Sequence, residues 1–74
     1  MKERAIYNRI KAALAENGKT NLWLATALRK NKVTVSKWCT NESQPTLETL
    51  YQIASILNID VRTLLVSNTS KTNG

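Results

Sequence analysis

The sequence predicts an all-α fold, a compact bundle of five short helices that contains a helix-turn-helix. Apolar residues recur at three- to four-residue spacing in one segment after another, as they do on the buried face of a helix. Polar residues that commonly cap helices stand immediately before most of these segments. The composition agrees with this prediction, because 42% of the 74 residues are hydrophobic and only two are Gly and one is Pro.

The first helix is expected over residues 3–16, where four apolar residues follow the spacing of one helix face. These residues are Ile6, Ile10, Ala13 and Leu14. Asn17-Gly18 is expected to end the helix with a left-handed residue. Thr20 is then a favourable N-cap for a second helix. Its inward residues are Leu24, Ala25 and Leu28.

Three further caps predict the rest of the bundle. Asn31 precedes a third helix over residues 32–39, in which Val35 and Trp38 form the buried edge. After a polar loop, Thr46 precedes a fourth helix over residues 47–57. Its helically spaced apolar residues are Leu47, Leu50, Ile53, Ala54 and Leu57. Asp60 is expected to cap a short fifth helix, with Val61, Leu64 and Leu65 on its inner face.

These elements form one expected domain over residues 1–66, because no linker or internal repeat interrupts them. Residues 67–74 include no apolar side chain and are expected to be a disordered polar tail. No apolar run approaches the length of about 18 residues that a membrane span needs. We therefore expect a soluble cytoplasmic protein with no membrane partner.

The composition also limits the chemistry. With no His and one Cys, Cys39, the chain is not expected to form a structural zinc site or an intrachain disulfide. Cys39 is interpreted as an inert small residue near the end of the third helix. The five acidic residues are scattered, and none is close to a Gly-rich phosphate loop. We expect no enzymatic activity and no cofactor, and so short a chain leaves no room for a domain that binds a small-molecule effector.

The charge is unevenly distributed. Eleven basic and five acidic residues give a net charge of +6. Residues 1–37 carry nine basic and two acidic side chains (+7), whereas residues 38–74 carry two basic and three acidic ones (−1). Four of the basic residues fall in a stretch of nine that contains no acidic residue: Arg29, Lys30, Lys32 and Lys37. A cluster of this kind is typical of a surface that binds nucleic acid.

The second and third predicted helices are joined by a three-residue turn, which is the helix-turn-helix arrangement. Small Ala25 lies where the helices are expected to cross. If Val35 and Trp38 face inward, the other side of the third helix presents lysines, a hydroxyl and methyl groups. Such a face suits the major groove, where lysine can donate to guanine and methyl groups can contact thymine.

The same region contains a longer pattern: Thr20-Asn21-Leu22-Trp23-Leu24-Ala25, Leu28, Asn31, Val35-Ser36-Lys37-Trp38, Gln44-Pro45-Thr46-Leu47-Glu48-Thr49-Leu50, Ile53-Ala54 and Leu57-Asn58-Ile59-Asp60. With this pattern, residues 6–66 resemble the Cro/XRE-type (lambda-repressor-like) helix-turn-helix DNA-binding domains. The resemblance implies that the third helix reads the major groove of double-stranded DNA. It also implies a homodimer that binds a palindromic operator.

By position, the resemblance places contacts to bases at Lys32, Val33, Thr34 and Lys37. The candidates for phosphate contacts are Asn21, Arg29, Lys30, Asn31, Ser36, Thr40, Asn41 and Ser43. Two positions depart from the family pattern, which usually has Gly at the position of Arg29 and an apolar residue at that of Lys30. A left-handed Arg29 would cost of order 1 kcal/mol relative to Gly. We interpret both departures as added phosphate contacts.

The C-terminal half has more apolar residues than one small core can bury. They are assigned to a two-fold interface: Tyr51, Ile59, Val61, Leu65 and Val66. Dimerisation suits the predicted function, because two recognition helices about 34 Å apart read successive major grooves.

The sequence therefore predicts a nucleoid-associated, sequence-specific transcriptional regulator, with repression favoured over activation. One alternative is a protein-interaction module, such as an antitoxin, that covers a protein partner with Trp23 or the C-terminal surface. Trp23 is otherwise explained by packing over the first helix, on Tyr7 or the stem of Lys11. A basic first helix that docks on anionic membranes is a weaker alternative, because its apolar face is needed for the core.

Overall fold

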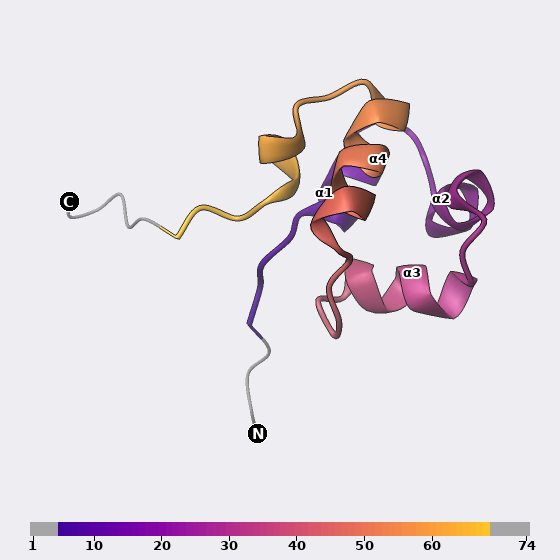
Figure 1. Cartoon of the computed structure of the whole chain (residues 1–74), viewed down its shortest axis with the longest axis horizontal. Helices are drawn as coiled ribbons and strands as arrows, with labels where there is room; N and C mark the ends of the chain where they lie inside the picture. Colours follow the sequence, from indigo (N-terminus) through magenta and orange to yellow (C-terminus); the bar gives the residue numbers. More distant parts are fainter. Residues whose placement is uncertain (1–4, 69–74) are drawn as a thin grey trace.

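The computed structural model describes residues 5–68, and every regular element in this range is helical. Four α-helices are followed by a short 3-10 helix (Figure 1). The elements are α1 (Ile10–Glu16), α2 (Asn21–Leu28), α3 (Lys32–Cys39), α4 (Leu47–Leu57) and η1 (Val61–Leu64). Among the described residues, no helix is both long enough and apolar enough to cross a membrane.

The core draws at least one side chain from each of the five helical elements. The largest side chains that are fully buried are Ile10, Leu14, Leu24, Val35, Ile53 and Leu64. Helices α2 and α3 pack against each other, and η1 packs against α4. The predicted inner face of the fourth helix is confirmed at four of its residues, Leu50, Ile53, Ala54 and Leu57. Leu47, the first residue of α4, is exposed.

The four predicted N-caps are confirmed. Each cap accepts a hydrogen bond from a backbone amide of the first turn that follows it, which satisfies a donor that the helix leaves free. The pairs are Thr20 Oγ1 with Trp23 N at 3.0 Å, Asn31 Oδ1 with Val33 N at 2.7 Å, Thr46 Oγ1 with Thr49 N at 3.1 Å and Asp60 Oδ1 with Arg62 N at 2.8 Å. These caps set where α2, α3, α4 and η1 begin.

All four α-helices end at a left-handed residue. These residues are Gly18 (φ 68°), Arg29 (φ 58°), Asn41 (φ 61°) and Asn58 (φ 57°). The amide of the following residue bonds back across the last turn in each case, as Lys30 N does to Ala25 O at 2.9 Å. Gly and Asn tolerate this conformation, whereas Arg29 pays a steric cost for its Cβ. The left-handed Arg29 considered from the sequence is therefore present.

The prediction for the first helix was wrong at its start, since α1 begins at Ile10 and not at residue 3. Within the described part, residues 5–9 are not helical, and Ile6 is 57% exposed instead of buried. Asn8 forms an antiparallel bridge with Leu65, flanked by hydrogen bonds from Arg9 N to Leu64 O at 2.8 Å and from Val66 N to Tyr7 O at 2.9 Å. Pairing with the C-terminal segment has replaced the helical hydrogen bonds that the local spacing favoured.

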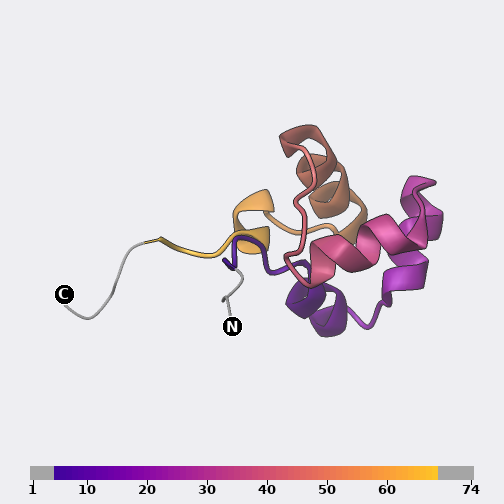
Figure 2. The same ribbon diagram turned by 90° about the horizontal axis from the view of Figure 1, so that it is seen from below.

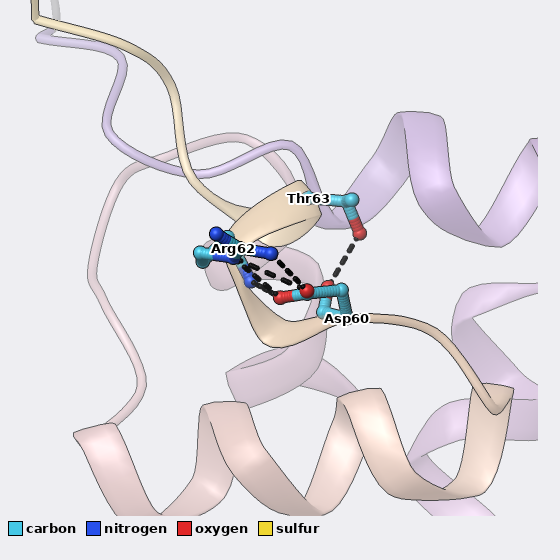
Figure 3. Close-up of polar contacts among 3 residues, drawn as sticks. All are labelled: Asp60, Arg62 and Thr63. Carbon is cyan, nitrogen blue, oxygen red and sulfur yellow. Dashed lines mark hydrogen bonds and ion pairs between the residues drawn. The ribbon is translucent and has the colours of Figure 1, made fainter.

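The fifth predicted element is a 3-10 helix of four residues, not an α-helix. Asp60 caps it, and the Arg62 side chain folds back onto the same carboxylate, with Nη2 2.7 Å from Oδ2 (Figure 3). These hydrogen bonds from Arg62 lower the pKa of Asp60 to about 2. The chain then becomes extended at Leu65, so this residue is exposed instead of lying on the inner face. Of the predicted tail, Ser67 and Asn68 are exposed, and residues 69–74 lie outside the described range, as do residues 1–4 of the predicted first helix.

Candidate nucleic-acid interface

Helices α2 and α3 form a helix-turn-helix with the turn at Arg29-Lys30-Asn31. Leu24 and Ala25 of α2 are buried, and so are Val35 and Trp38 of α3, which confirms the predicted inward faces of both helices. Because Val35 and Trp38 are anchored in the core, the opposite face of α3 must point outward. In the view from below, α3 lies in front of the other helices and none covers it (Figure 2).

The outward face of α3 combines two cations with short polar and apolar groups. All four residues predicted to contact bases are exposed: Lys32, Val33, Thr34 and Lys37. A hollow of about 490 Å³ lies along this face, and its lining residues are Lys32, Val33, Ser36, Lys37, Thr40 and Glu42. The hollow therefore joins two of the predicted base-reading lysines to the loop that follows α3.

Glu42, which no sequence pattern marked as a site residue, also lies in this hollow. It follows the left-handed Asn41, and its amide donates to Lys37 O at 2.8 Å, which places it beside the last turn of α3. A carboxylate here repels phosphates and can accept a hydrogen bond from cytosine N4. Helical periodicity could not place Glu42, because the helix ends at Cys39.

The turn residues predicted to contact phosphates are accessible. Arg29, Lys30 and Asn31 are exposed, and Asn31 also caps α3. Within residues 5–68 the ion pairs are Arg9–Glu16 and Asp60–Arg62, and neither involves a basic residue of the 29–37 cluster. The cations beside α3 thus face solvent without an acidic partner in the part of the chain that the structure describes.

Three hydroxyl residues proposed to contact phosphates also lie at the surface. Ser36, Thr40 and Ser43 are all exposed. The Thr40 hydroxyl donates back to α3, 3.2 Å from Ser36 O and 3.3 Å from Lys37 O. The contact to a backbone carbonyl limits the freedom of this hydroxyl to donate to a phosphate.

The two remaining asparagine candidates are tied into the fold. Asn21 is half-buried, and its Oδ1 accepts a hydrogen bond from Cys39 Sγ at 3.2 Å, which joins the start of α2 to the end of α3. Asn41 is only 8% exposed. Its Oδ1 accepts from Tyr7 N at 2.8 Å and Asn8 N at 3.0 Å, and its Nδ2 donates to Asn8 O at 3.1 Å. Internal partners therefore occupy the side-chain amide of Asn41, and its contact to a phosphate stays a prediction.

Cys39 and Trp23 are placed mainly by packing. Burial raises the pKa of the Cys39 thiol, and the nearby Lys11 ammonium partly opposes this increase. Trp23 packs at the edge of the core, and Lys19 Nζ lies 4.8 Å from its ring centroid, within range of a cation–π interaction. Next to Trp23 in the chain, Leu22 is exposed.

The five residues predicted to form the dimer interface do not share one environment. Ile59 and Val61 are partly buried and pack against the core of their own chain. Tyr51, Leu65 and Val66 are exposed. Three of the five predicted interface residues are therefore open to solvent, whereas the other two contribute to the core of their own chain.

The helical bundle, its capped turn and the uncovered α3 together define a helix-turn-helix domain. The helix-turn-helix family model of the Cro/C1 type matches residues 10–64, and the chain belongs to this family. A crystal structure of a protein from Bacteroides fragilis, provisionally described as DNA-binding, is similar, with a TM-score of 0.79 and 49% sequence identity. The match covers 80% of this chain and 95% of that one. Among curated proteins, none matches this chain significantly.

Proposed function

We propose that the protein is a non-enzymatic, sequence-specific DNA-binding regulator whose helix α3 enters the major groove. The observation that carries this proposal is the uncovered face of α3. It presents Lys32 and Lys37 to solvent, beside Arg29 and Lys30 of the turn, and the ion pairs of residues 5–68 do not neutralise any of the four. Membership of the helix-turn-helix family and the description of the Bacteroides fragilis relative as DNA-binding support the same function.

The contacts divide by chemistry. Arg29, Lys30 and the exposed hydroxyls contact phosphates, which supply affinity without reading sequence. Lys32 and Lys37 donate to guanine O6 or N7, while the methyl groups of Val33 and Thr34 contact thymine. The protein acts in the cytoplasm, associated with the nucleoid.

A single α3 reads only a few base pairs, so a homodimer on a palindromic operator is part of this proposal. Two copies of α3 separated by about 34 Å would enter successive major grooves on one side of the duplex. A dimer bound across a promoter would exclude the transcription machinery, and repression is therefore the favoured outcome.

A matched pair of lysine substitutions tests the proposal. Lys37→Ala removes a base-reading donor and should relax the preference at one base position, with a discrimination loss of about 1–3 kcal/mol. Lys30→Ala removes a phosphate contact and should weaken binding to all duplexes alike, lowering the slope of log K against log salt by about 0.9. Binding to an array of double-stranded sequences measures both effects. Equal binding of the native protein to every duplex would overturn the operator-reading function.

Leu22 supports a second candidate, a protein-interaction module such as an antitoxin. Leu22 is 61% exposed on α2, next to the half-buried Trp23, so a large apolar side chain is open to solvent at this position. A partner bound at this position would co-purify with the native protein and be lost from Leu22→Glu. A native protein that purifies alone and binds DNA selectively would exclude this candidate.

A further inference from the structure

Asn8 is a buried polar residue that lies just before α1 and outside the helix-turn-helix. It is only 4% exposed, and both ends of its side-chain amide are hydrogen-bonded. Its Oδ1 accepts from Ile10 N at 3.0 Å, at the start of α1. Its Nδ2 donates to oxygens 30 and 36 residues further along the chain, Trp38 O at 3.0 Å and Gln44 Oε1 at 2.7 Å. One side chain therefore joins the start of α1 to the end of α3 and to the loop that follows it.

The neighbouring amides require a donor at the side chain of Asn8. Asn41 Oδ1 accepts from Tyr7 N at 2.8 Å and from Asn8 N at 3.0 Å, and this fixes the direction of the Asn41 amide because a backbone N–H only donates. Gln44 must then turn its Nε2 towards the same oxygen, at 3.1 Å. The Oε1 of Gln44 is left facing Asn8, as is the carbonyl of Trp38. Both oxygens need a donor, and Asn8 Nδ2 supplies one to each.

Asn8 holds the loop between α3 and α4 at two points. We call this segment, residues 40–46, the α3–α4 loop, and its two anchors are Asn41 and Gln44. Glu42 and Ser43 lie between the anchors and are exposed. Their amides donate to Lys37 O, at 2.8 and 3.2 Å. The loop is therefore held both by Asn8 and by the last turn of α3, and Glu42 lines the hollow on the outward face of that helix.

We propose that Asn8 is a positioning residue of the DNA interface, which keeps Glu42 and Ser43 in one place against the duplex. This inference rests on the proposed function. Asn8 is buried and does not itself reach DNA, so it acts through Asn41 and Gln44. In the part of the chain that the structure describes, every nitrogen or oxygen of a buried side chain has a partner, and a fully bonded network makes the segments that it joins rigid. A change at Asn8 should alter the DNA contacts of the α3–α4 loop and leave those of the turn before α3 intact.

Glu42 reports where the α3–α4 loop lies. Its carboxylate repels phosphates, and the repulsion weakens as the distance grows and as water and salt fill the gap. Glu42→Gln should therefore raise the affinity for a mixed-sequence DNA duplex about fivefold at low salt when the loop is held, and less than about twofold when the loop is loose. A residue that contributes only stability would leave this ratio unchanged, because it has no coupling to Glu42 in the folded molecule.

Asn8→Asp is the variant that tests the proposal. The new side chain keeps an oxygen for Ile10 N, so the start of α1 stays capped. At mildly alkaline pH it is a carboxylate and offers no donor to Trp38 O or Gln44 Oε1, which releases the anchor at Gln44. Fluorescence anisotropy measures the effect of Glu42→Gln with and without Asn8→Asp.

Asn17→Asp is the matched control. Asn17 Nδ2 also donates to a backbone carbonyl, Ala13 O at 2.8 Å, so the substitution removes one such bond and adds the same charge at the end of α1. We expect Glu42→Gln to raise the affinity about fivefold in the native and Asn17→Asp backgrounds, and less than about twofold with Asn8→Asp. Lys30→Ala, in the turn before α3, should lower the slope of log K against log salt by about 0.9 in all three. Circular dichroism checks that each variant is folded.

Three outcomes would overturn the proposal. Glu42→Gln has the same effect with Asn8→Asp as without it, Glu42→Gln has no effect in the native chain, or Asn8→Asp also removes the effect of Lys30→Ala. In the second case the loop does not lie at the duplex, and in the third the change is not confined to the loop. Should Asn8→Asp not fold, Gln44→Met replaces it. This variant removes one anchor and leaves the bond from Asn8 to Trp38 O, and the effect of Glu42→Gln must again fall.

The proposed function is judged separately, from the binding of the native protein to an array of duplexes. A native protein that binds selectively, with an effect of Glu42→Gln that Asn8→Asp does not change, keeps that function and rejects the role of Asn8. A native protein that binds every duplex equally rejects the operator-reading function, and the mixed-sequence duplex still decides whether Asn8 positions the loop.

Discussion

The side-chain amide of Asn41 pairs with the backbone of Asn8 as a neighbouring β-strand would. Asn8 N donates to Asn41 Oδ1 at 3.0 Å, and Asn41 Nδ2 donates to Asn8 O at 3.1 Å. The same Asn41 is the left-handed residue that ends α3. Tyr7 N and Gln44 Nε2 also donate to its Oδ1. One residue thus ends the recognition helix and holds the N-terminal segment against it.

Asn41→Ala should destabilise the fold by about 3 kcal/mol. The change leaves buried backbone groups of Asn8 without partners, which costs about 1–3 kcal/mol, and it puts an alanine into the left-handed region for about 1 kcal/mol more. Urea unfolding followed by circular dichroism measures the loss.

Asn58→Ala is the matched control. Asn58 is also left-handed at a helix end, but it is exposed, and its side chain has no hydrogen bond within residues 5–68 that the structure records. Asn58→Ala should therefore lower the free energy of unfolding by only about 1 kcal/mol, the cost of placing an alanine in the left-handed conformation. Equal losses from the two variants would show that the Asn41 amide contributes nothing beyond backbone conformation.

Helices whose bounds are set by capping residues and by apolar spacing within the helix could be predicted from the sequence. The third and fourth helices span the expected residues 32–39 and 47–57, because polar caps and apolar periodicity agree at both. The start of α1 was not predictable from spacing. Its decisive contacts join Asn8 to Trp38, Asn41 and Leu65, which are distant in sequence. Contacts between residues so far apart in the sequence do not affect the local spacing of apolar residues, so that spacing could not predict them.

The candidate site divides in the same way. The inward positions of Val35 and Trp38 determine which side of α3 faces outward. Helical periodicity was therefore sufficient to predict that the base-contact candidates on this helix are exposed. Asn41 and Glu42 lie beyond the helix end, where a left-handed residue reverses the chain. Their side chains then point in directions that periodicity does not describe. Asn41 is buried, whereas Glu42 lies beside the lysines of α3.

Arg29→Gly should stabilise the domain and weaken DNA binding at the same time. Arg29 is left-handed with φ 58° at the end of α2, and glycine adopts this conformation without the Cβ clash. The free energy of unfolding should rise by about 1 kcal/mol. Loss of one phosphate contact should lower the slope of log K against log salt by about 0.9.

Thermal unfolding and fluorescence anisotropy at several salt concentrations measure the two effects of Arg29→Gly. Asn58→Gly serves as the control, since it replaces a left-handed residue at the end of α4 and should leave the salt slope unchanged. If Arg29→Gly is more stable yet keeps native affinity and slope, Arg29 does not contact a phosphate.

Asp60 should make stability depend on pH in the acid range. Hydrogen bonds from Arg62 lower the pKa of Asp60 from an ordinary 3.8 to about 2 in the folded chain. The unfolded chain therefore takes up the proton first as the pH falls. The contribution of the carboxylate is complete above pH 3.8 and is lost as the pH falls through about 2.

Urea unfolding at a series of pH values measures this effect, with Asp60→Asn for comparison. The variant keeps a side-chain oxygen that can cap η1 but has no charge, so the native advantage over it should shrink steadily below pH 3.8. Arg62→Gln should return the pKa of Asp60 towards 3.8, which NMR titration of the carboxyl group detects. A native advantage that persists unchanged at pH 2 would contradict the assignment.

Glu42→Gln should tighten binding to DNA. Glu42 shares the hollow on the outward face of α3 with Lys32 and Lys37. Its negative charge repels the phosphates that approach this face, and one unit charge at a few ångströms changes the free energy by about 1 kcal/mol in water. An increase in affinity of about fivefold is therefore expected for all duplexes at low salt, with a smaller increase at high salt.

Glu48→Gln makes the same charge change in the first turn of α4, outside the residues that line the hollow. Glu48→Gln should raise the affinity less, because Glu48 is not among the residues that line the hollow with Lys32 and Lys37. Anisotropy titrations of both variants on one duplex compare them. If Glu42→Gln instead weakens binding only to sequences with cytosine at one position, the carboxylate accepts a hydrogen bond from cytosine N4. Equal effects of the two variants would mean that Glu42 acts only through net charge and does not lie at the DNA interface.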